Sequence, residues 1–219
     1  MDIHLQHYLS NKKVTLVAVS KTHPDKAIIQ LYNENQRVFG ENKVQELVGK
    51  FERLPKDIAW HFIGHLQSNK VKYIAPFVDT IHSIDSLKIL KEINKQAIKN
   101  NRIIKCLIQV KIAKEKEKFG IEIADLPDFL EEIRQESKEG IAIIGLMGMA
   151  TYTSDENQIK EEFQLLQHTF KQIKKSYFPN DENFKELSMG MSLDYKIAIE
   201  CGSTMIRIGS LLFGDRNHQ

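Results

Sequence analysis

The chain has 219 residues, of which 42% are hydrophobic and 27% charged, and its formal net charge is +2 at pH 7. This is the composition of an ordinary folded protein, and a chain of this length buries a sizeable core without disulfides or structural metals. The near balance of acids and bases argues against nucleic-acid binding, and no apolar run approaches the roughly 20 residues of a membrane span.

In the first half of the chain, short apolar runs rich in β-branched residues alternate with longer helical patterns. The expected strands are 14–21, 37–41, 58–64 and 80–84. The expected helices are 24–35, 42–54, 68–75 and 86–101. Each apolar run is therefore followed by a segment long enough to cross back over a sheet.

The second half repeats this alternation. The expected strands are 105–112, 142–149, 186–190 and the start of 204–214, and the expected helices are 126–137, 155–177 and 192–201. Strands that alternate with helices pair in parallel through right-handed crossovers. Eight such units without a linker predict one α/β domain over residues 1–219, a closed (β/α)8 TIM-type barrel. A doubly wound open sheet is the alternative.

The two cysteines and the N-terminus bear on the compartment. Cys106 and Cys201 are too few for a disulfide scaffold and indicate a reducing environment. The N-terminal stretch MDIHLQHYLSNKK lacks the apolar core of a secretory signal peptide. We therefore expect a cytoplasmic protein. The oligomeric state stays open between a monomer, which can close its own core, and a dimer.

The first expected strand ends in Lys21, which shares a strand face with Val17 and Val19. In (β/α)8 barrels the active site lies at the carboxyl ends of the strands. If the two valines pack inside the barrel, Lys21 emerges at that rim. Apolar surroundings there would favour the neutral amine that condenses with a carbonyl. A solvated lysine at a strand end is the alternative interpretation.

The C-terminal stretch ECGSTMIRIGSLLFG is rich in small residues that suit an anion site. Residues 202–204 and the pair Gly209–Ser210 supply glycines, hydroxyls and backbone N–H groups. The preceding LSMGMS stretch adds Ser192 at the expected start of a helix. Barrels frequently hold a phosphate near their last two strands. Generic turn glycines are the alternative.

Arg207 lies two residues before Gly209 and so shares its face of the last strand. An arginine that faces a barrel interior is costly unless it is paired or binds a ligand. Its guanidinium donates hydrogen bonds without readily losing its charge, so a pyridine nitrogen beside it would stay unprotonated. A surface salt bridge is the alternative role.

Seven segments, in order along the chain, resemble the pyridoxal-phosphate homeostasis protein family. The resemblance covers residues 10–216, and the segments are AVSKTHP, FGENKVQE, WHFIGHLQSNK, HSID, GLMGMA, LSMGMSLDY and GSTMIRIGSLLFG. Proteins of this family resemble the N-terminal barrel domain of alanine racemase. The resemblance therefore implies a barrel of the alanine racemase N-terminal domain type that binds pyridoxal 5′-phosphate (PLP) as its cofactor.

The resemblance also assigns roles to residues. Lys21 matches the lysine that forms the internal aldimine with PLP. Phosphate contacts are implied for Ser192, Gly209 and Ser210, and Arg207 matches the arginine beside the cofactor. The remaining expected cofactor-binding residues, at the edge of PLP, are Asn42 and Met147.

The resemblance implies a PLP carrier or regulator of PLP homeostasis, which is not an enzyme. Such a protein would hold PLP on Lys21 and limit the free aldehyde, and it would either buffer PLP or transfer it to PLP-dependent apoenzymes. We assign no catalytic residue and no metal ligand. We also expect no second β domain, which completes the active site in related racemases and decarboxylases. The alternatives are a small PLP-dependent amino-acid racemase and a lysine-dependent aldolase.

Several other polar residues are not expected to bind metal or to take part in chemistry. His61 and His65 are four residues apart but lie in a strand and a loop, so a zinc site is not expected. His82 is expected to be a satisfied structural histidine. Ser68 is expected either to cap a helix or to belong to a ligand-access loop. The loop 113–121 departs from the family pattern, so no detailed contact is transferred to it.

Overall fold

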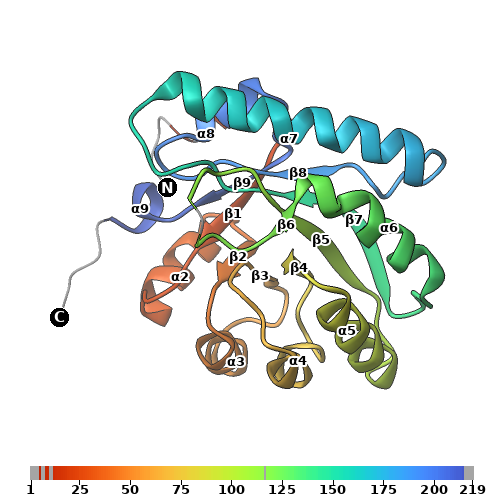
Figure 1. Ribbon diagram of the computed structural model, residues 1–219. Coiled ribbons are helices and arrows are strands. Elements are labelled where there is room, and N and C mark those ends of the chain that lie inside the picture. Colours follow the sequence, from red (N-terminus) through yellow and green to blue (C-terminus); the bar gives the residue numbers. More distant parts are fainter. Residues whose placement is uncertain (1–4, 6–7, 10–11, 116, 215–219) are drawn as a thin grey trace.

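Eight parallel strands close into a barrel in the part of the chain that the computed structural model describes, residues 5, 8–9, 12–115 and 117–214 (Figure 1). The barrel strands are β1 (Thr15–Val19), β2 (Val38–Glu41), β3 (Ala59–Phe62), β4 (Thr80–Ile84), β5 (Ile104–Lys111), β7 (Ile141–Met147), β8 (Glu186–Ser188) and β9 (Met205–Ile208). They pair in the order β4-β3-β2-β1-β9-β8-β7-β5, and β5 pairs with β4 to complete the ring. This closure confirms the predicted barrel and shows that the open sheet is wrong.

Helices connect the strands and cover the outside of the barrel (Figure 1). They are α2 (Asp25–Asn33), α3 (Val44–Arg53), α4 (Ser68–Ile74), α5 (Leu87–Lys99), η1 (Ile123–Asp125), α6 (Leu126–Gln135), α7 (Glu156–Tyr177), α8 (Tyr195–Glu200) and α9 (Ser210–Phe213). A short strand, β6 (Ile121–Glu122), pairs in parallel with the last residues of β5 and was not expected from the sequence. None of the described helices combines the length and apolar character that crossing a bilayer demands.

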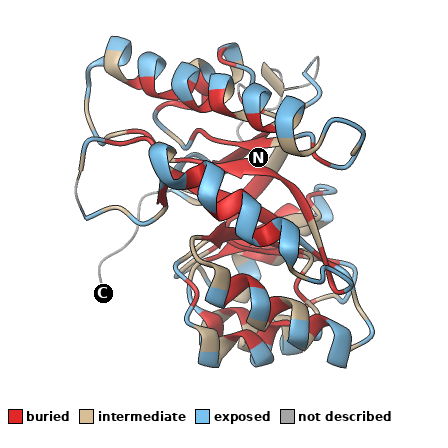
Figure 2. Ribbon diagram, turned by 45° about the vertical axis from the view of Figure 1, so that its right-hand side comes forward, coloured by how far each residue is buried: buried red, intermediate tan, exposed pale blue. Residues whose placement is uncertain are grey.

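Two apolar layers hold the fold together. Alternate strand residues point inward, where Val17, Leu107 and Met147 form part of a small cluster inside the barrel. A larger cluster, which includes Trp60 and Phe163, fills the space between strands and helices. Buried residues accordingly line the strands and the inner helix faces, while the outer helix faces are exposed (Figure 2).

Two expected element boundaries shift for identifiable reasons. The expected helix 192–201 begins only at Tyr195, because the Asp194 carboxylate accepts a hydrogen bond from the Met191 N–H at 2.5 Å and holds the preceding turn. Ser68 is the first residue of α4, and Gln67 at the cap position makes no side-chain cap bond, so the predicted cap is wrong.

The prediction of one domain over residues 1–219 stays a prediction, because both ends lie outside the described residues.

Candidate functional site

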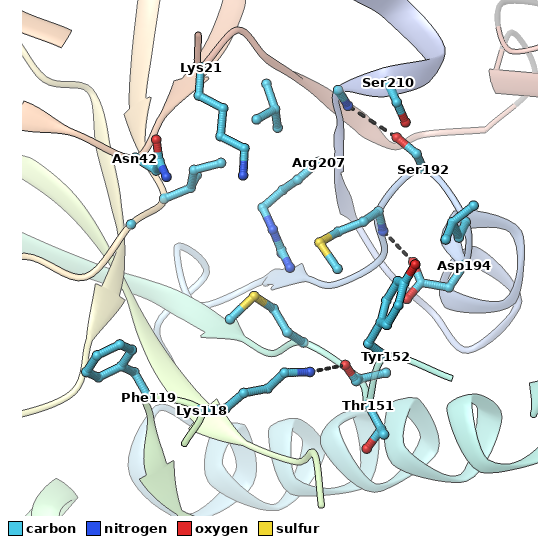
Figure 3. Close-up of a pocket in the computed structure, with 18 of the residues that line it drawn as sticks. Lys21, Asn42, Lys118, Phe119, Thr151, Tyr152, Ser192, Asp194, Arg207 and Ser210 are labelled. Carbon is cyan, nitrogen blue, oxygen red and sulfur yellow. Dashed lines mark hydrogen bonds between the residues drawn. The ribbon is translucent and has the colours of Figure 1, made fainter. Parts of the chain in front are cut away.

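A cavity of about 580 Å³ opens at the carboxyl ends of the barrel strands (Figure 3). Lys21 reaches it from just beyond β1 and Asn42 from just beyond β2. Gly64, which follows β3, lets the two backbones pack closely at Asn42, because a Cβ at Gly64 would collide with the carbonyl oxygen of Asn42. The opposite wall comes from the segments around β8 and β9.

The structure brings six of the seven predicted site residues together at this cavity. They are Lys21, Asn42, Ser192, Arg207, Gly209 and Ser210. Met147 is not among the lining residues and lies 1% exposed in the cluster inside the barrel. Met149 lines the cavity in its place, two residues further along the chain.

The charges at the cavity are mainly positive. Among the described lining residues the basic ones include Lys21, Lys118 and Arg207, and the one carboxylate is Asp194. Burial raises the pKa of Asp194, although the Met191 N–H and the nearby guanidinium oppose that rise. The Arg207 guanidinium and the two lysines, set against a carboxyl group whose pKa is raised by burial, make this cavity suitable for an anionic ligand.

Arg207 points into the barrel and is 4% exposed, so a surface salt bridge is the wrong interpretation. Its Nη1 donates to Ser188 Oγ at 2.7 Å, and its Nη2 donates to the carbonyl oxygen of Gly148 at 3.0 Å. Burial lowers the pKa of Arg207 to about 10, against the opposing effect of Asp194. The guanidinium is therefore still charged at neutral pH and holds N–H donors at the floor of the cavity.

The small polar residues divide between the two ends of the last strand. Ser192 Oγ accepts a hydrogen bond from the Gly209 N–H at 3.3 Å, and Ser210 begins α9 beside them. Ser203 is buried and donates to backbone oxygens, while Thr204 bonds to Glu186 at 2.7 Å. The 202–204 group therefore builds the barrel, and the group around Gly209 faces the cavity.

A buried ion-pair network clamps the backbone on both sides of Lys21. The Lys50 ammonium, 3% exposed, donates to the Ser20 carbonyl oxygen, to Glu41 and to Glu46, each at 2.7 Å. Glu46 also accepts from the Thr22 N–H at 2.6 Å, and Thr22 has a positive φ of 67°. These bonds fix the turn in which Lys21 projects into the cavity.

The innermost member of this network is Glu41, whose side chain is 0% exposed. It accepts from the Ser20 hydroxyl at 2.6 Å as well as from Lys50. Burial raises the pKa of Glu41, and Lys50 opposes that rise. The carboxylate is thus tolerated only because its partners are in place.

Several lining residues were not predicted from the sequence. Lys118 donates to the Ala150 carbonyl oxygen at 2.6 Å, and Phe119 stacks on His65 with ring centroids 4.1 Å apart. At the rim, Tyr152 is 84% exposed and Leu193 is 83% exposed. These residues come from loops without a periodic pattern. The one usable signal was the Lys118-Phe119-Gly120 stretch within a loop that otherwise departs from the family pattern.

The two histidines considered as metal ligands lie in different parts of the barrel. His65 pairs with Asp85 at 3.2 Å at the cavity mouth, whereas His61 is buried inside the barrel. Among the described residues, no group of three or more His, Cys, Asp or Glu side chains converges in a way that could hold a metal ion.

Sequence comparison places the chain among known proteins. The family model for the alanine racemase N-terminal domain matches residues 4–217. A pyridoxal phosphate homeostasis protein of Aquifex aeolicus (strain VF5) is 39% identical over 206 residues, which cover 93% of this chain and 87% of that protein. The protein of the same name from Escherichia coli (strain K12) is 35% identical over 216 residues, or 95% and 88% of the two chains.

One solved structure is similar to this chain in both sequence and fold. PipY of Synechococcus elongatus PCC7942, with PLP bound, superposes with a TM-score of 0.85 and 35% sequence identity. The match covers 96% of this chain and 98% of PipY. The likeness therefore extends over nearly the whole of both chains.

Proposed function

The chain belongs to the pyridoxal phosphate homeostasis protein family, one with the alanine racemase N-terminal domain fold, and from this we propose that it binds PLP and regulates its intracellular supply. Relatives at 35–40% identity carry that name, and the similar PipY structure contains PLP. The observation in this chain that carries the proposal is the convergence of Lys21, Arg207 and the Ser192–Gly209 pair on one cavity.

The residues at the cavity fit the chemical groups of PLP. A phosphate suits a cationic site that also offers hydroxyl and backbone N–H donors. When bound, PLP supplies an aldehyde carbon that condenses reversibly with a primary amine. Lys21 is a primary amine that projects into the cavity from a fixed turn (Figure 3).

Each residue then has a proposed role in holding the cofactor. Lys21 provides the amine that bonds the aldehyde, and Ser192, Gly209 and Ser210 hold the phosphate. Arg207 would lie beside the cofactor, and if one of its N–H groups met the pyridine nitrogen, that nitrogen would stay unprotonated. Asn42 lines the edge of the ring. Met147 supports this floor from inside the barrel instead of lining the cavity.

A first prediction isolates the phosphate site. Ser192→Ala removes a hydroxyl next to the proposed phosphate, and a hydrogen bond to a charged group contributes about 1.5–3 kcal/mol. We expect PLP affinity to fall by about 10-fold or more, measured by equilibrium dialysis. Pyridoxal, which lacks the phosphate, serves as the control and should bind the variant and the parent equally. An equal loss for both ligands would contradict this assignment.

We infer that the protein carries PLP without catalysing a reaction on it and delivers it to PLP-dependent apoenzymes in the cytoplasm. The relatives are named for homeostasis. Among the described lining residues the one tyrosine is Tyr152, which is 84% exposed, so its hydroxyl proton is open to exchange with bulk water. A racemase would exchange the α-hydrogen of an amino acid with solvent deuterium. We expect no such exchange across a panel of amino acids with PLP bound.

The experiment that tests the proposal is reduction with borohydride. The protein is incubated with PLP, its visible absorption is recorded, and the reduced adduct is mapped by mass spectrometry. We expect the cofactor's absorption band to disappear and a single pyridoxyl group to lie on Lys21. An adduct on Lys118, the other lysine lining the cavity, or on scattered exposed lysines would contradict the assignment.

A further inference from the structure

Beneath Arg207 a line of polar side chains crosses the interior of the barrel. Ser188 Oγ lies 3.1 Å from His82 Nδ1, and His82 Nε2 lies 2.9 Å from His61 Nδ1. His61 Nε2 lies 3.5 Å from a carboxylate oxygen of Asp79, a longer contact than the others. Ser188 and His82 are 0% exposed and His61 is 4% exposed. The line therefore links the guanidinium at the cavity to a carboxylate at the opposite end of the barrel.

The two ends of this line determine which atom donates in each contact. An ionised Asp79 can only accept, so His61 carries its proton on Nε2 and, when neutral, accepts at Nδ1. His82 must then donate from Nε2 and accept at Nδ1 from the Ser188 hydroxyl. Ser188 Oγ still has a lone pair for Arg207, which can only donate. Every contact thus runs in one direction, from Arg207 to Asp79.

Burial keeps the two imidazoles neutral. It lowers the pKa of His61, against the pull of the Asp79 carboxylate. It also lowers the pKa of His82 well below its ordinary value, and nearby His61 and Arg207 lower that pKa further. The charged groups that face the pair are Asp79, Lys105 and Glu186 at the lower end and Arg207 at the upper end.

The lower end of the line opens into a second cavity of about 370 Å³, which His61, Asp79 and Lys105 help to line. Burial would raise the pKa of Asp79, but hydrogen bonds from His61 and Thr80, together with the Lys105 ammonium, hold it well below the usual range. Thr80 Oγ1 donates to Asp79 at 2.7 Å. The carboxylate is therefore a permanent acceptor at neutral pH.

We propose that His82 and His61 are positioning residues for Arg207, which they hold through Ser188 against the anchor at Asp79. The one-way order of donors keeps an acceptor beneath Arg207 Nη1, and Gly148 provides a second acceptor for Nη2, so the guanidinium is held in place while its remaining N–H groups stay available to the cavity. The inference rests on the proposed function only in that Arg207 serves the cofactor. The positions of the imidazole protons do not depend on PLP.

One consequence is a specific sensitivity to acid. The ordinary histidine pKa of 6.5 applies to the unfolded chain, and both folded pKa values are lower. Stability from this pair is therefore complete above pH 6.5 and is lost as the pH falls toward the folded values. We expect the unfolding equilibrium constant to rise by up to about tenfold per pH unit for each histidine. Urea titrations at several pH values measure this constant. An unfolding midpoint that did not change on acidification would contradict the statement that both histidines are neutral in the folded protein.

The decisive experiment is nitrogen-15 NMR of the imidazoles in the PLP-free protein at neutral pH. We expect both His82 and His61 to carry a proton on Nε2 and none on Nδ1. A proton on Nδ1 of either ring, or a doubly protonated ring, would overturn the proposal. Because no cofactor is present, failure of the proposed PLP function would leave this result unaffected.

Variants then test whether the line positions Arg207. His82→Leu removes the acceptor under Ser188, and we expect PLP affinity to fall about 10-fold, or about 1.4 kcal/mol. His82→Asn places an amide oxygen near the position of Nδ1, so it should restore most of the affinity. Ser83→Ala, at the next and oppositely facing residue of β4, is the control and should leave affinity unchanged. Equal losses in the Leu and Asn variants would mean that packing alone matters and would overturn the positioning role.

Discussion

Replacing Lys21 with alanine is expected to abolish the visible absorption change that PLP produces on binding and to weaken PLP retention by at least about 100-fold, or about 2.7 kcal/mol. The reason is that the variant loses the amine that bonds the aldehyde but keeps the phosphate site around Ser192. Gel filtration of the PLP-loaded protein measures how much PLP is retained, and an absorption spectrum of the eluted protein measures the absorption change. Some non-covalent binding should remain, because the phosphate contacts are untouched.

Two matched lysine variants make this result interpretable. Lys118→Ala removes the other lysine of the cavity, and Lys26→Ala removes an exposed lysine on α2. Both should keep the pyridoxyl adduct on Lys21 after reduction. A Lys21→Ala protein that retained PLP with the parental spectrum would show that another amine holds the aldehyde.

Replacing Lys50 with methionine is expected to lower the free energy of unfolding by about 3–5 kcal/mol. Methionine fills a similar volume but leaves Glu41, at 0% exposure, as a buried carboxylate without its cation. It also releases the Ser20 carbonyl oxygen and so loosens the turn that holds Lys21. Urea denaturation followed by circular dichroism measures the change in stability.

The pH dependence of this variant is a further check on the cause. Burial raises the folded pKa of Glu41 above its ordinary 4.5, and loss of Lys50 raises it more. A raised folded pKa means that stability is complete below the unfolded pKa and is lost as the pH rises, so the deficit should be larger at pH 8 than at pH 4. Lys95→Met, on the exposed face of α5, should change stability by less than about 0.5 kcal/mol. If Lys50→Met lowered the free energy of unfolding no more than Lys95→Met does, the ion-pair network around Lys50 would not be what holds this turn.

The barrel itself could be predicted because its signal is repeated along the chain. Eight apolar runs followed by helical patterns leave few arrangements, and the parallel crossover rule favours closure. Lys21, Arg207 and Gly209 could be placed because each occupies a definite position at or near a strand end, where the carboxyl ends meet. The expectation that the hydrogen-bonding groups of His82 are satisfied is also confirmed, since both its ring nitrogens have partners.

Other features could not be predicted because they depend on contacts between distant segments. Lys50 lies on the same buried stripe of α3 as Val44 and Leu47, where a local pattern favours leucine. Its partners Ser20 and Glu41 come from other elements, so only the folded barrel shows why a lysine is there. Met147 was expected at the cavity edge, but its strand position turns it toward the barrel interior and leaves Met149 to line the cavity.

The pairing of β1 with β9 has a consequence for how the protein is made. A ribosome releases Lys21 early and Arg207, Gly209 and Ser210 late, so most of the chain exists before the two walls of the cavity can meet. Closing so long a loop carries a large entropic penalty that only the completed ring of strands offsets. We therefore expect selective cofactor loading to begin only after translation has passed the last strand.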